Sequence, residues 1–235
     1  MKLSEHLYKL CGVEYGTNST CYGAVCPDGL VLFDAGAGAQ ERAVMEHTRR
    51  DWGIAALPVT HVFLTHAHFD HSGNAAWFRR QGATILSSAA EAEAIAAAGP
   101  ETLRYLTKTE IQPCTVDRPL ADGQTVRVGG LCVECISIPG HSPGSMAYQV
   151  EIDGLSALFV GDLLTVDGAT PDNDMLLSLP WQGGPGADNQ AFAQSVGKLC
   201  RRHADLIAPG HLAVFRGDCD GLLRKLHKMA QDAIA

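Results

Sequence analysis

Four potential metal ligands stand within six residues, directly behind an apolar strand with the sequence HVFLT. They are His66, His68, Asp70 and His71. Imidazole nitrogens and carboxylate oxygens are the ligands that suit zinc, iron or manganese. Alternate residues of an extended chain project to the same side, so His66 and His68 can reach one ion. Where the chain then turns into a helix, Asp70 and His71 can be aimed at a second ion nearby.

Three further polar residues follow apolar strands in the same way. CISIPG leads to His141, ALFVG leads to Asp162, and LIAPG leads to His211. Ligands in α/β folds gather at the carboxyl ends of strands, and a glycine shortly before each of these residues lets the backbone approach a site closely. We therefore expect these three side chains to join the histidine-rich segment in one metal site.

Short apolar strands alternate with helical stretches along the whole chain. The expected strands are Cys21–Val25, Leu30–Asp34, His61–Thr65, Ala83–Leu86, Thr125–Val128, Leu131–Ile138, Ser145–Ile152, Leu158–Val160 and Leu206–Ala208. The expected helices are Ala39–Asp51, Ser72–Gln81, Ser88–Ala98, Glu101–Thr109, Asp188–His203 and Asp218–Ile234. The order of strands and helices starts again after about Ala121, with no linker rich in serine or proline. The pattern predicts an α/β fold with a single domain, residues 1–235, made of two similar halves at about 1–121 and 122–235.

The segment Leu163–Ala187 has little periodicity and is rich in glycine and proline. A long irregular segment inside a compact domain is often functional. Because it follows directly on Asp162, we expect it to overhang the metals. Its Met175, Leu177 and Trp181 would then form an apolar wall for the acyl part of a small-molecule substrate. A packing role is the alternative explanation of the tryptophan.

The overall charge disfavours nucleic acid as a partner. The chain has 18 basic and 26 acidic side chains and a formal net charge of -8, and an acidic surface repels phosphate backbones. No stretch reaches the length of a membrane span, and the N-terminal segment lacks the apolar core of a secretory signal, so we expect a cytoplasmic protein.

Cys132 and Cys135 resemble a C-x-x-C pair. Their odd separation in a strand directs the two thiols to opposite faces, which disfavours a shared zinc ion.

The motif H-x-H-x-D-H, followed by a distant His, Asp and His, resembles the metallo-β-lactamase superfamily. The similarity is to the branch shared by glyoxalase II-like thioesterases and acyl-homoserine lactonases, and it runs from LVLFDAG to the PGH near the end. It implies a four-layer αβ/βα sandwich, in which two mixed β-sheets pack face to face and helices cover both outer sides. The motifs specify the fold and the metal site far more closely than the substrate.

The resemblance also implies a role for each candidate residue. The first ion would be bound by His66, His68 and His141, the second by Asp70, His71 and His211, with Asp162 as the bridge between them. Asp34, in LFDAG, matches a position that supports the metal loop, and Thr65 could support it in the same way. A turn residue before glycine is the alternative explanation of Asp34.

Such a site is expected to hold two divalent ions, with zinc as the first choice and iron or manganese as alternatives. Two ions about 3.5–4 Å apart share a water and convert it into a bridging hydroxide, which is a strong nucleophile. Asp70 could carry the proton to the leaving group. We therefore expect a hydrolase that cleaves an ester, thioester or lactone bond of a small molecule.

Other functions fit parts of the same sequence. A persulfide dioxygenase with one iron would use only His66, His141 and Asp162, so metal analysis separates it from a two-metal hydrolase. A β-lactam hydrolase is a further alternative, although an Asp-His pair combined with a bridging aspartate departs from that group. A lactonase often has a tyrosine near its site, for which Tyr148 and Tyr105 are available. The remaining alternative is a binding module without catalysis.

Overall fold

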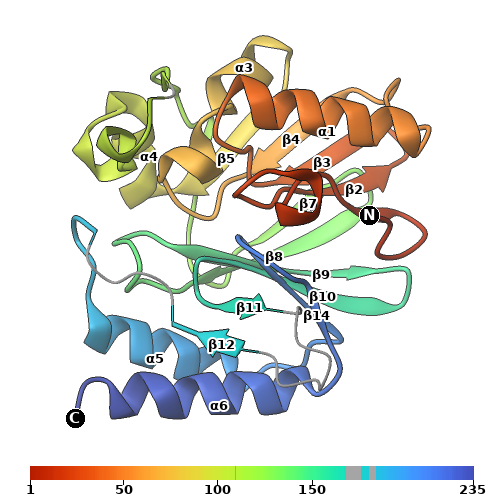
Figure 1. Ribbon diagram of the computed structural model, residues 1–235. Helices are drawn as coiled ribbons and strands as arrows, with labels where there is room; N and C mark the ends of the chain where they lie inside the picture. Colours follow the sequence, from red (N-terminus) through yellow and green to blue (C-terminus); the bar gives the residue numbers. More distant parts are fainter. Residues whose placement is uncertain (109, 168–175, 180–183) are drawn as a thin grey trace.

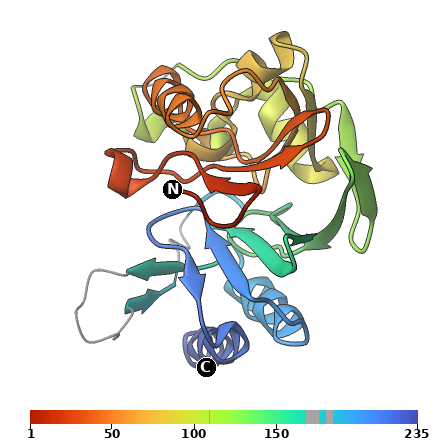
Figure 2. The ribbon, with the colours of Figure 1, turned by 90° about the vertical axis from the view of Figure 1, so that its right-hand side faces the viewer.

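The computed structural model of this chain has four layers, in which two β-sheets lie face to face between two layers of helices (Figure 1). It describes residues 1–108, 110–167, 176–179 and 184–235. A view turned by 90° shows the N-terminal half, red to yellow-green, above the C-terminal half, green to blue (Figure 2). The expected αβ/βα sandwich is confirmed.

The first sheet is built by the N-terminal half of the chain. In spatial order its strands are β1 (Leu7–Lys9), β2 (Tyr22–Cys26), β3 (Gly29–Phe33), β4 (Val59–Phe63), β5 (Thr84–Ser88) and β6 (Arg118–Leu120). β1, β2 and β3 are antiparallel, whereas β3, β4, β5 and β6 are parallel. The parallel strands therefore direct their carboxyl ends to the same edge of the sheet.

The second sheet is built by the C-terminal half. In spatial order its strands are β14 (Phe215–Arg216), β13 (Leu206–Pro209), β10 (Leu155–Gly161), β9 (Met146–Ile152), β8 (Leu131–Ser137) and β7 (Thr125–Val128). β10 and β13 are parallel and the other pairs are antiparallel. The change from one sheet to the other falls between Leu120 and Thr125, and the assignment of residues 1–235 to a single domain stays a prediction.

Helices cover the outer face of each sheet (Figure 1). The α-helices are α1 (Ala39–Asp51), α2 (Phe69–Ser72), α3 (Ala75–Arg80), α4 (Ala89–Ala97), α5 (Asn189–Leu199) and α6 (Cys219–Asp232), and the 3-10 turns are η1 (Val13–Tyr15), η2 (Pro100–Thr102) and η3 (Arg104–Leu106). Side chains cap three of the α-helices at their N-termini: Ser88 caps α4, Asp188 caps α5 and Asp218 caps α6. Among the residues that the structure describes, no helix has both the length and the apolar character needed to cross a membrane.

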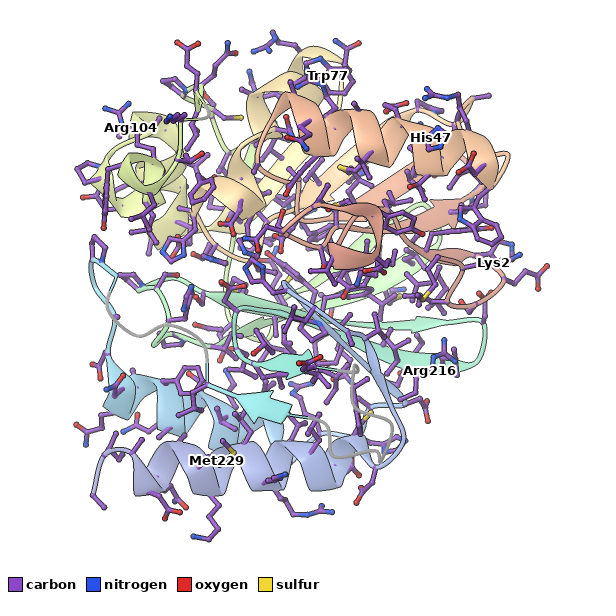
Figure 3. All side chains as sticks on the ribbon, in the orientation of Figure 1. Lys2, His47, Trp77, Arg104, Arg216 and Met229 are labelled. Carbon is purple, nitrogen blue, oxygen red and sulfur yellow. The ribbon has the colours of Figure 1, made fainter. Side chains whose placement is uncertain are left out.

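Apolar side chains fill the space between the sheets and the space beneath each helix layer (Figure 3). Alternation along β3 shows how one strand serves two of these layers. Val31 and Phe33 face the second sheet, where the rings of Phe33 and Phe159 stack with centroids 3.8 Å apart. Leu30 and Leu32 face the helices on the other side. β3 is thus buried on both faces, which fixes its orientation in the sandwich.

Two expected helices differ in the structure. Glu101–Thr109 does not form one continuous α-helix over its described residues, because Leu103 has a left-handed backbone with φ 55° and separates the two 3-10 turns η2 and η3. The Leu103 side chain is buried, and such tertiary packing overrides local helix propensity. Of the expected helix Ser72–Gln81, Ala75–Arg80 forms α3, whereas Ser72 is the last residue of α2. Between the two helices the Asn74 side chain donates hydrogen bonds to the carbonyls of Ala35 and Gly38.

The segment Leu163–Ala187, expected to be irregular, contains a two-stranded ribbon. β11 (Thr165–Asp167) pairs antiparallel with β12 (Leu176–Ser178), and Val166 lies opposite Leu177. The expectation of no regular structure is therefore wrong for these residues. The sequence gives little signal because each strand has only three residues.

Candidate metal centre

Loops that follow four strands bring the seven predicted ligands together. His66 and His68 follow β4, Asp70 and His71 lie in α2, His141 follows β8, Asp162 follows β10, and His211 follows β13. Their ligand atoms form two groups, one of His66, His68, His141 and Asp162 and the other of Asp70, His71 and His211. Within each group these atoms lie within 4.8 Å of one another. The binding of ions by these residues stays a prediction.

Asp162 lies between the two groups. Its Oδ2 is 3.4 Å from His141 Nε2 and 3.9 Å from His66 Nε2. Its Oδ1 is 3.1 Å from His71 Nε2 and 3.3 Å from His211 Nε2. Each carboxylate oxygen therefore faces a different group, which is the arrangement that a bridging ligand needs.

Asp34 orients two of the histidines. Its Oδ2 accepts a hydrogen bond from His71 Nδ1 at 2.8 Å and another from Thr65 Oγ1 at 2.9 Å. The hydroxyl of Thr65 has only one hydrogen, so at its 3.0 Å contact with His66 it must accept from Nδ1. Nδ1 of both imidazoles thus carries a proton, which leaves Nε2 directed into the centre as the atom that can bind a metal ion. Partners of this kind fix the tautomer and the orientation of metal-binding histidines.

A loop near the N-terminus orients His211. The Asn18 carbonyl oxygen lies 3.1 Å from His211 Nδ1, and since a carbonyl only accepts, Nδ1 donates and Nε2 is left as the ligand atom. Ser19 forms an isolated β-bridge with His211, and the Thr20 amide donates to the Gly210 carbonyl at 2.7 Å. Residues of the first half of the chain therefore hold a ligand of the second half.

Glycine is required next to two of the ligands. A Cβ atom on Gly210 would lie 2.5 Å from Asp162 Oδ1 and 2.5 Å from His71 Cε1, so a side chain there would enter the centre. Gly161 has φ 51°, and a Cβ atom on it would lie 2.6 Å from Thr65 Oγ1. The close backbone approach expected at these positions is present in the structure.

Two buried glutamates support the ligand loops and were not among the residues expected from the sequence. Glu91, in α4, accepts hydrogen bonds from the Ala67 amide, the Ser142 hydroxyl and the Gly144 amide, each at 2.7 Å. Glu41, in α1, accepts from the amides of Asn18, Ser19 and Ala37. Their sequence signal is only an acidic residue in the first turn of a helix.

Burial keeps His66 and His68 neutral. Removal from water lowers the pKa of His66 well below its usual range, and the neighbouring His71 and His68 lower it further. Burial, together with His141, lowers the pKa of His68 to about 3. A neutral imidazole is the form that binds a metal ion.

The second group pairs histidines with carboxylates. Burial alone would lower the pKa of His71 and His211, but the charge of Asp162 outweighs it, and the pKa of His211 rises to about 10. Burial would raise the pKa of Asp162 and Asp70, yet the nearby His71 and His211 lower both. Without an ion these groups share protons, which a metal ion must displace when it binds.

Unpaired buried atoms show that the residues fit metal ions. His66 Nε2, His71 Nε2 and Asp162 Oδ1 are buried in the centre, and none of them has a partner with hydrogen-bond geometry among the described residues. His68 faces the centre with Nδ1, which lies 3.0 Å from His141 Nε2. Buried polar atoms without partners are costly and call for a specific explanation. Nitrogen and carboxylate donors that converge in two groups are explained by two divalent cations.

The structure describes only some of the other residues predicted from the sequence. Met175 and Trp181 lie outside the described residues, and Leu177 is placed only by its pairing in β12. Tyr148 is fully buried between the sheets and donates to the Leu64 carbonyl at 2.6 Å, whereas Tyr105 is 60% exposed in η3. Nothing in this arrangement assigns a catalytic role to either tyrosine.

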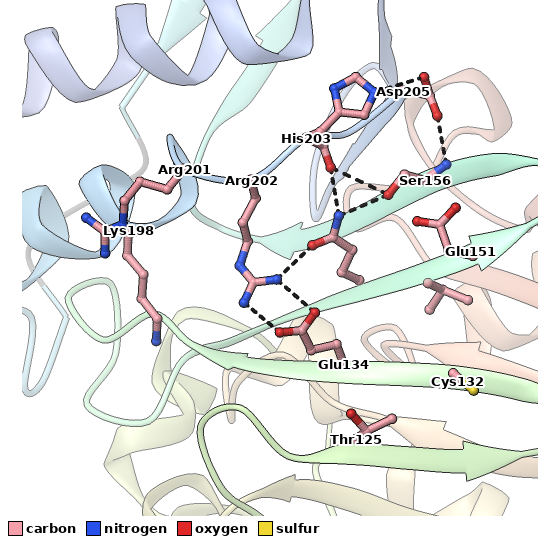
Figure 4. A pocket seen from close by; sticks show the side chains of 12 residues that line it. Thr125, Cys132, Glu134, Glu151, Ser156, Lys198, Arg201, Arg202, His203 and Asp205 are labelled. Atoms are coloured by element: carbon pink, nitrogen blue, oxygen red, sulfur yellow. Dashed lines mark hydrogen bonds and ion pairs between the residues drawn. The ribbon is translucent and has the colours of Figure 1, made fainter.

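A hollow of about 840 Å³ lies on the outer face of the second sheet beside α5 (Figure 4). Arg202 binds the Glu134 carboxylate there with two hydrogen bonds of 2.6 and 2.8 Å and also binds Gln149 at 3.0 Å. None of the seven potential ligands is among the described residues that line it. Because Arg202 and Glu134 neutralise each other, the hollow gives no reason to place the chemistry there.

Comparison with protein families gives one match over most of the chain. Residues 15–211 match the model of the metallo-beta-lactamase superfamily. A subclass B3 metallo-beta-lactamase of Bradyrhizobium japonicum has a similar solved structure, with a TM-score of 0.75, 18% identity, and coverage of 100% of this chain and 91% of that chain. At this identity the likeness concerns the fold.

Two curated relatives carry names of hydrolytic enzymes. A hydroxyacylglutathione hydrolase of Rhizobium johnstonii is 33% identical over 146 residues, which are 61% of this chain and 47% of the relative. An atrochrysone carboxyl ACP thioesterase of Emericella nidulans is 25% identical over 167 residues, which are 68% of this chain and 45% of the relative. The chain thus spans about half the length of the curated relatives it matches.

Proposed function

This chain belongs to the metallo-beta-lactamase superfamily, and from that premise we propose that it is a dinuclear metal-dependent hydrolase of a small-molecule ester, thioester or lactone. The observation that carries the proposal is the set of seven donors in two adjoining groups, with Asp162 between them. We propose zinc as the metal, because histidine and carboxylate are its ordinary ligands. Two bound ions would lower the pKa of a shared water and supply the hydroxide nucleophile.

The residues of the chain divide the remaining work. Asp34 and Thr65 hold His66 and His71 with Nε2 directed inward. Asp70 lies in the second group, with Oδ2 3.3 Å from His211 Nε2, and 11% of its side chain is exposed. We assign to Asp70 the transfer of a proton to the leaving group, because a positioned carboxylate can take a proton and release it within one turnover.

Among the three bond types we propose a thioester first. The relatives named a hydroxyacylglutathione hydrolase and a thioesterase support this choice. The structural neighbours named metallo-beta-lactamases support only the fold, so we propose no β-lactam activity.

The test combines metal analysis with a substrate panel. The purified protein should contain two divalent ions per chain and should cleave at least one of an S-acyl glutathione, an S-acyl N-acetylcysteamine, an aryl ester or an acyl-homoserine lactone. A chelator should remove the activity and added zinc should restore it. One iron per chain, with oxygen consumed on a persulfide substrate, would establish the dioxygenase alternative instead. Two bound ions without turnover of any substrate would favour a binding module.

His71→Ala separates a two-metal hydrolase from a one-iron enzyme. The loss of this ligand from the second group should reduce the metal content toward one ion per chain and lower kcat at least about 100-fold, the usual effect of removing a preorganised electrostatic element. His47→Ala is the matched control, because His47 lies on α1 with 69% of its side chain exposed. Full activity of the His71 variant would contradict the hydrolase.

A further inference from the structure

We propose that Glu91 is a positioning residue that clamps the loop of His66 and His68 to the loop of His141, and so sets the metal affinity of the first group. The inference rests on the proposed metal-dependent function. Glu91 touches none of the ligands itself; it acts through their chain neighbours. Ala67 lies between His66 and His68, and Ser142 follows His141.

The contacts of Glu91 join loops that belong to different sheets. Its Oε2 accepts from the Ala67 amide, in the loop that follows the first-sheet strand β4. Its Oε1 accepts from the Ser142 hydroxyl and the Gly144 amide, which follow the second-sheet strand β8. One carboxylate therefore fixes the relative position of three ligands that come from two halves of the chain.

The surroundings of Glu91 leave little room for another arrangement. Glu91 is only 3% exposed. A Cβ atom on Gly144 would lie 2.4 Å from Ser88 Oγ and 2.9 Å from Glu91 Cγ, so the His141 loop is packed directly against the start of α4. Ser88 in turn caps this helix by accepting from the Glu91 amide. The clamp is thus attached to a rigid element that follows β5.

The chemistry of the clamp requires a carboxylate. Three donors converge on two oxygens, and a carboxylate is the side chain that only accepts. In Glu91→Gln the shape is nearly unchanged, but one oxygen becomes an NH₂ group. That group faces either the Ala67 amide or the Gly144 amide, so at least one backbone N–H of a ligand loop loses its acceptor. The loss of one acceptor should move the loop of His66 and His68 away from the loop of His141, while the side-chain volume in the core stays the same.

The experiment measures zinc affinity by competition with a chromogenic chelator. Wild type, Glu91→Gln and Glu93→Gln are compared. Each is also measured in combination with His211→Ala, which removes a ligand of the second group, so that zinc binding by the first group is measured alone. Glu93 is the matched control, because it lies exposed on the same helix. We expect Glu91→Gln to weaken zinc binding by the first group about 10- to 100-fold, as is usual when the partners of metal ligands are changed, and Glu93→Gln to leave it unchanged.

Thermal melts with and without zinc separate positioning from general stability. If Glu91 acts through the ligands, the rise in Tm that zinc gives to wild type should shrink in Glu91→Gln, because stabilisation by a ligand follows its affinity. If Glu91 only supports the fold, the Tm of the metal-free protein falls and zinc affinity stays at the wild-type value, which would overturn the proposal.

Ser142→Ala covers the case in which Glu91→Gln fails to fold. It removes one donor and keeps the carboxylate, so we expect zinc affinity to fall about threefold or more, the equivalent of one hydrogen bond. Unchanged affinity in this variant would overturn the clamp. A wild-type protein that binds no zinc would overturn the proposed function as well, whereas unchanged affinity in the variants would leave that function standing.

Discussion

Asp34→Asn tests whether metal binding depends on the Asp34 carboxylate, which accepts hydrogen bonds from His71 and Thr65. Asp34 accepts hydrogen bonds from the Thr65 amide at 2.7 Å, the Thr65 hydroxyl at 2.9 Å and His71 Nδ1 at 2.8 Å. Its backbone is left-handed, with φ 63°. Asparagine tolerates that conformation as aspartate does, so the substitution changes the hydrogen bonds and not the backbone.

The size of the effect follows from the number of acceptors lost. Asparagine keeps one carbonyl oxygen, so its NH₂ group faces either the Thr65 amide or the pair formed by the Thr65 hydroxyl and His71 Nδ1. A buried hydrogen bond to a charged group contributes about 1.5–3 kcal/mol, and we therefore expect the free energy of unfolding to fall by about 2 kcal/mol. For a chain of this size that is a decrease in Tm of about 4–8 °C. The loss of orientation at His66 and His71 should also lower metal affinity about 10- to 100-fold.

Asp153→Asn is the matched control for this experiment. Asp153 also has a positive φ, 53°. Its carboxylate also accepts hydrogen bonds from three groups: the Ser4 hydroxyl, the His6 backbone amide and His6 Nδ1. It lies in the exposed β9–β10 turn, and its partners Ser4 and His6 are not among the seven predicted ligands. With Glu5 and His6 it forms a separate group of exposed side chains. Chelator competition and thermal melts of both variants provide the comparison. The reasoning is refuted if Asp34→Asn binds two ions as tightly as wild type, or if Asp153→Asn loses as much affinity.

Two further substitutions test the substrate wall and a distant ion pair. Trp181→Ala should raise KM more for long-chain than for short-chain acyl substrates, and Trp52→Ala is the control. Equal effects of Trp181→Ala on both chain lengths would indicate that Trp181 has a packing role. Asp117→Ala should lower the free energy of unfolding by about 1–2 kcal/mol at pH 7, because Asp117 accepts from Arg79 and from the Ile85 amide. Burial would raise the pKa of Asp117, but the hydrogen bond from Arg79 lowers it on balance. The contribution of Asp117 to the free energy of unfolding is therefore present above the unfolded pKa of about 3.9, and it is lost as the pH falls through the folded pKa. The difference in Tm between variant and wild type should therefore narrow between pH 7 and pH 3, and a constant difference would contradict this account.

The sequence predicts the strands that are continuous apolar runs, or that are joined by a turn with a recognisable sequence. HVFLT and ALFVG are continuous apolar runs, and Asp153-Gly154 is a turn with positive φ at both residues. The strands that the sequence did not predict are short and lie at or near the sheet edges. β1 contains Lys9, whose buried Nζ binds Glu14 and the Leu212 carbonyl, and β6 contains Pro119, which is acceptable in a strand only at an edge.

The convergence of the seven candidate ligands could be predicted because they lie in segments that follow strands, and parallel strands deliver their carboxyl ends to one edge of a sheet. Their supporting residues could not be predicted in the same way. Glu91 is separated from Ser142 by 51 residues and Asn18 from His211 by 193 residues. Contacts at such separations depend on how the two sheets pack, and a single sequence carries no period or spacing that reports them.

Both ligand groups draw donors from both halves of the chain. The first takes His66 and His68 from the first half and His141 from the second, and the second takes His71 from the first half and His211 from the second. Neither sheet can therefore present a complete group before it packs against the other. If a metal ion binds only the complete group, as we propose, its binding free energy should add to the stability of the sandwich rather than to that of one half. The same geometry explains why residues that cross between the halves, such as Glu91, are the ones on which the affinity of the centre should depend.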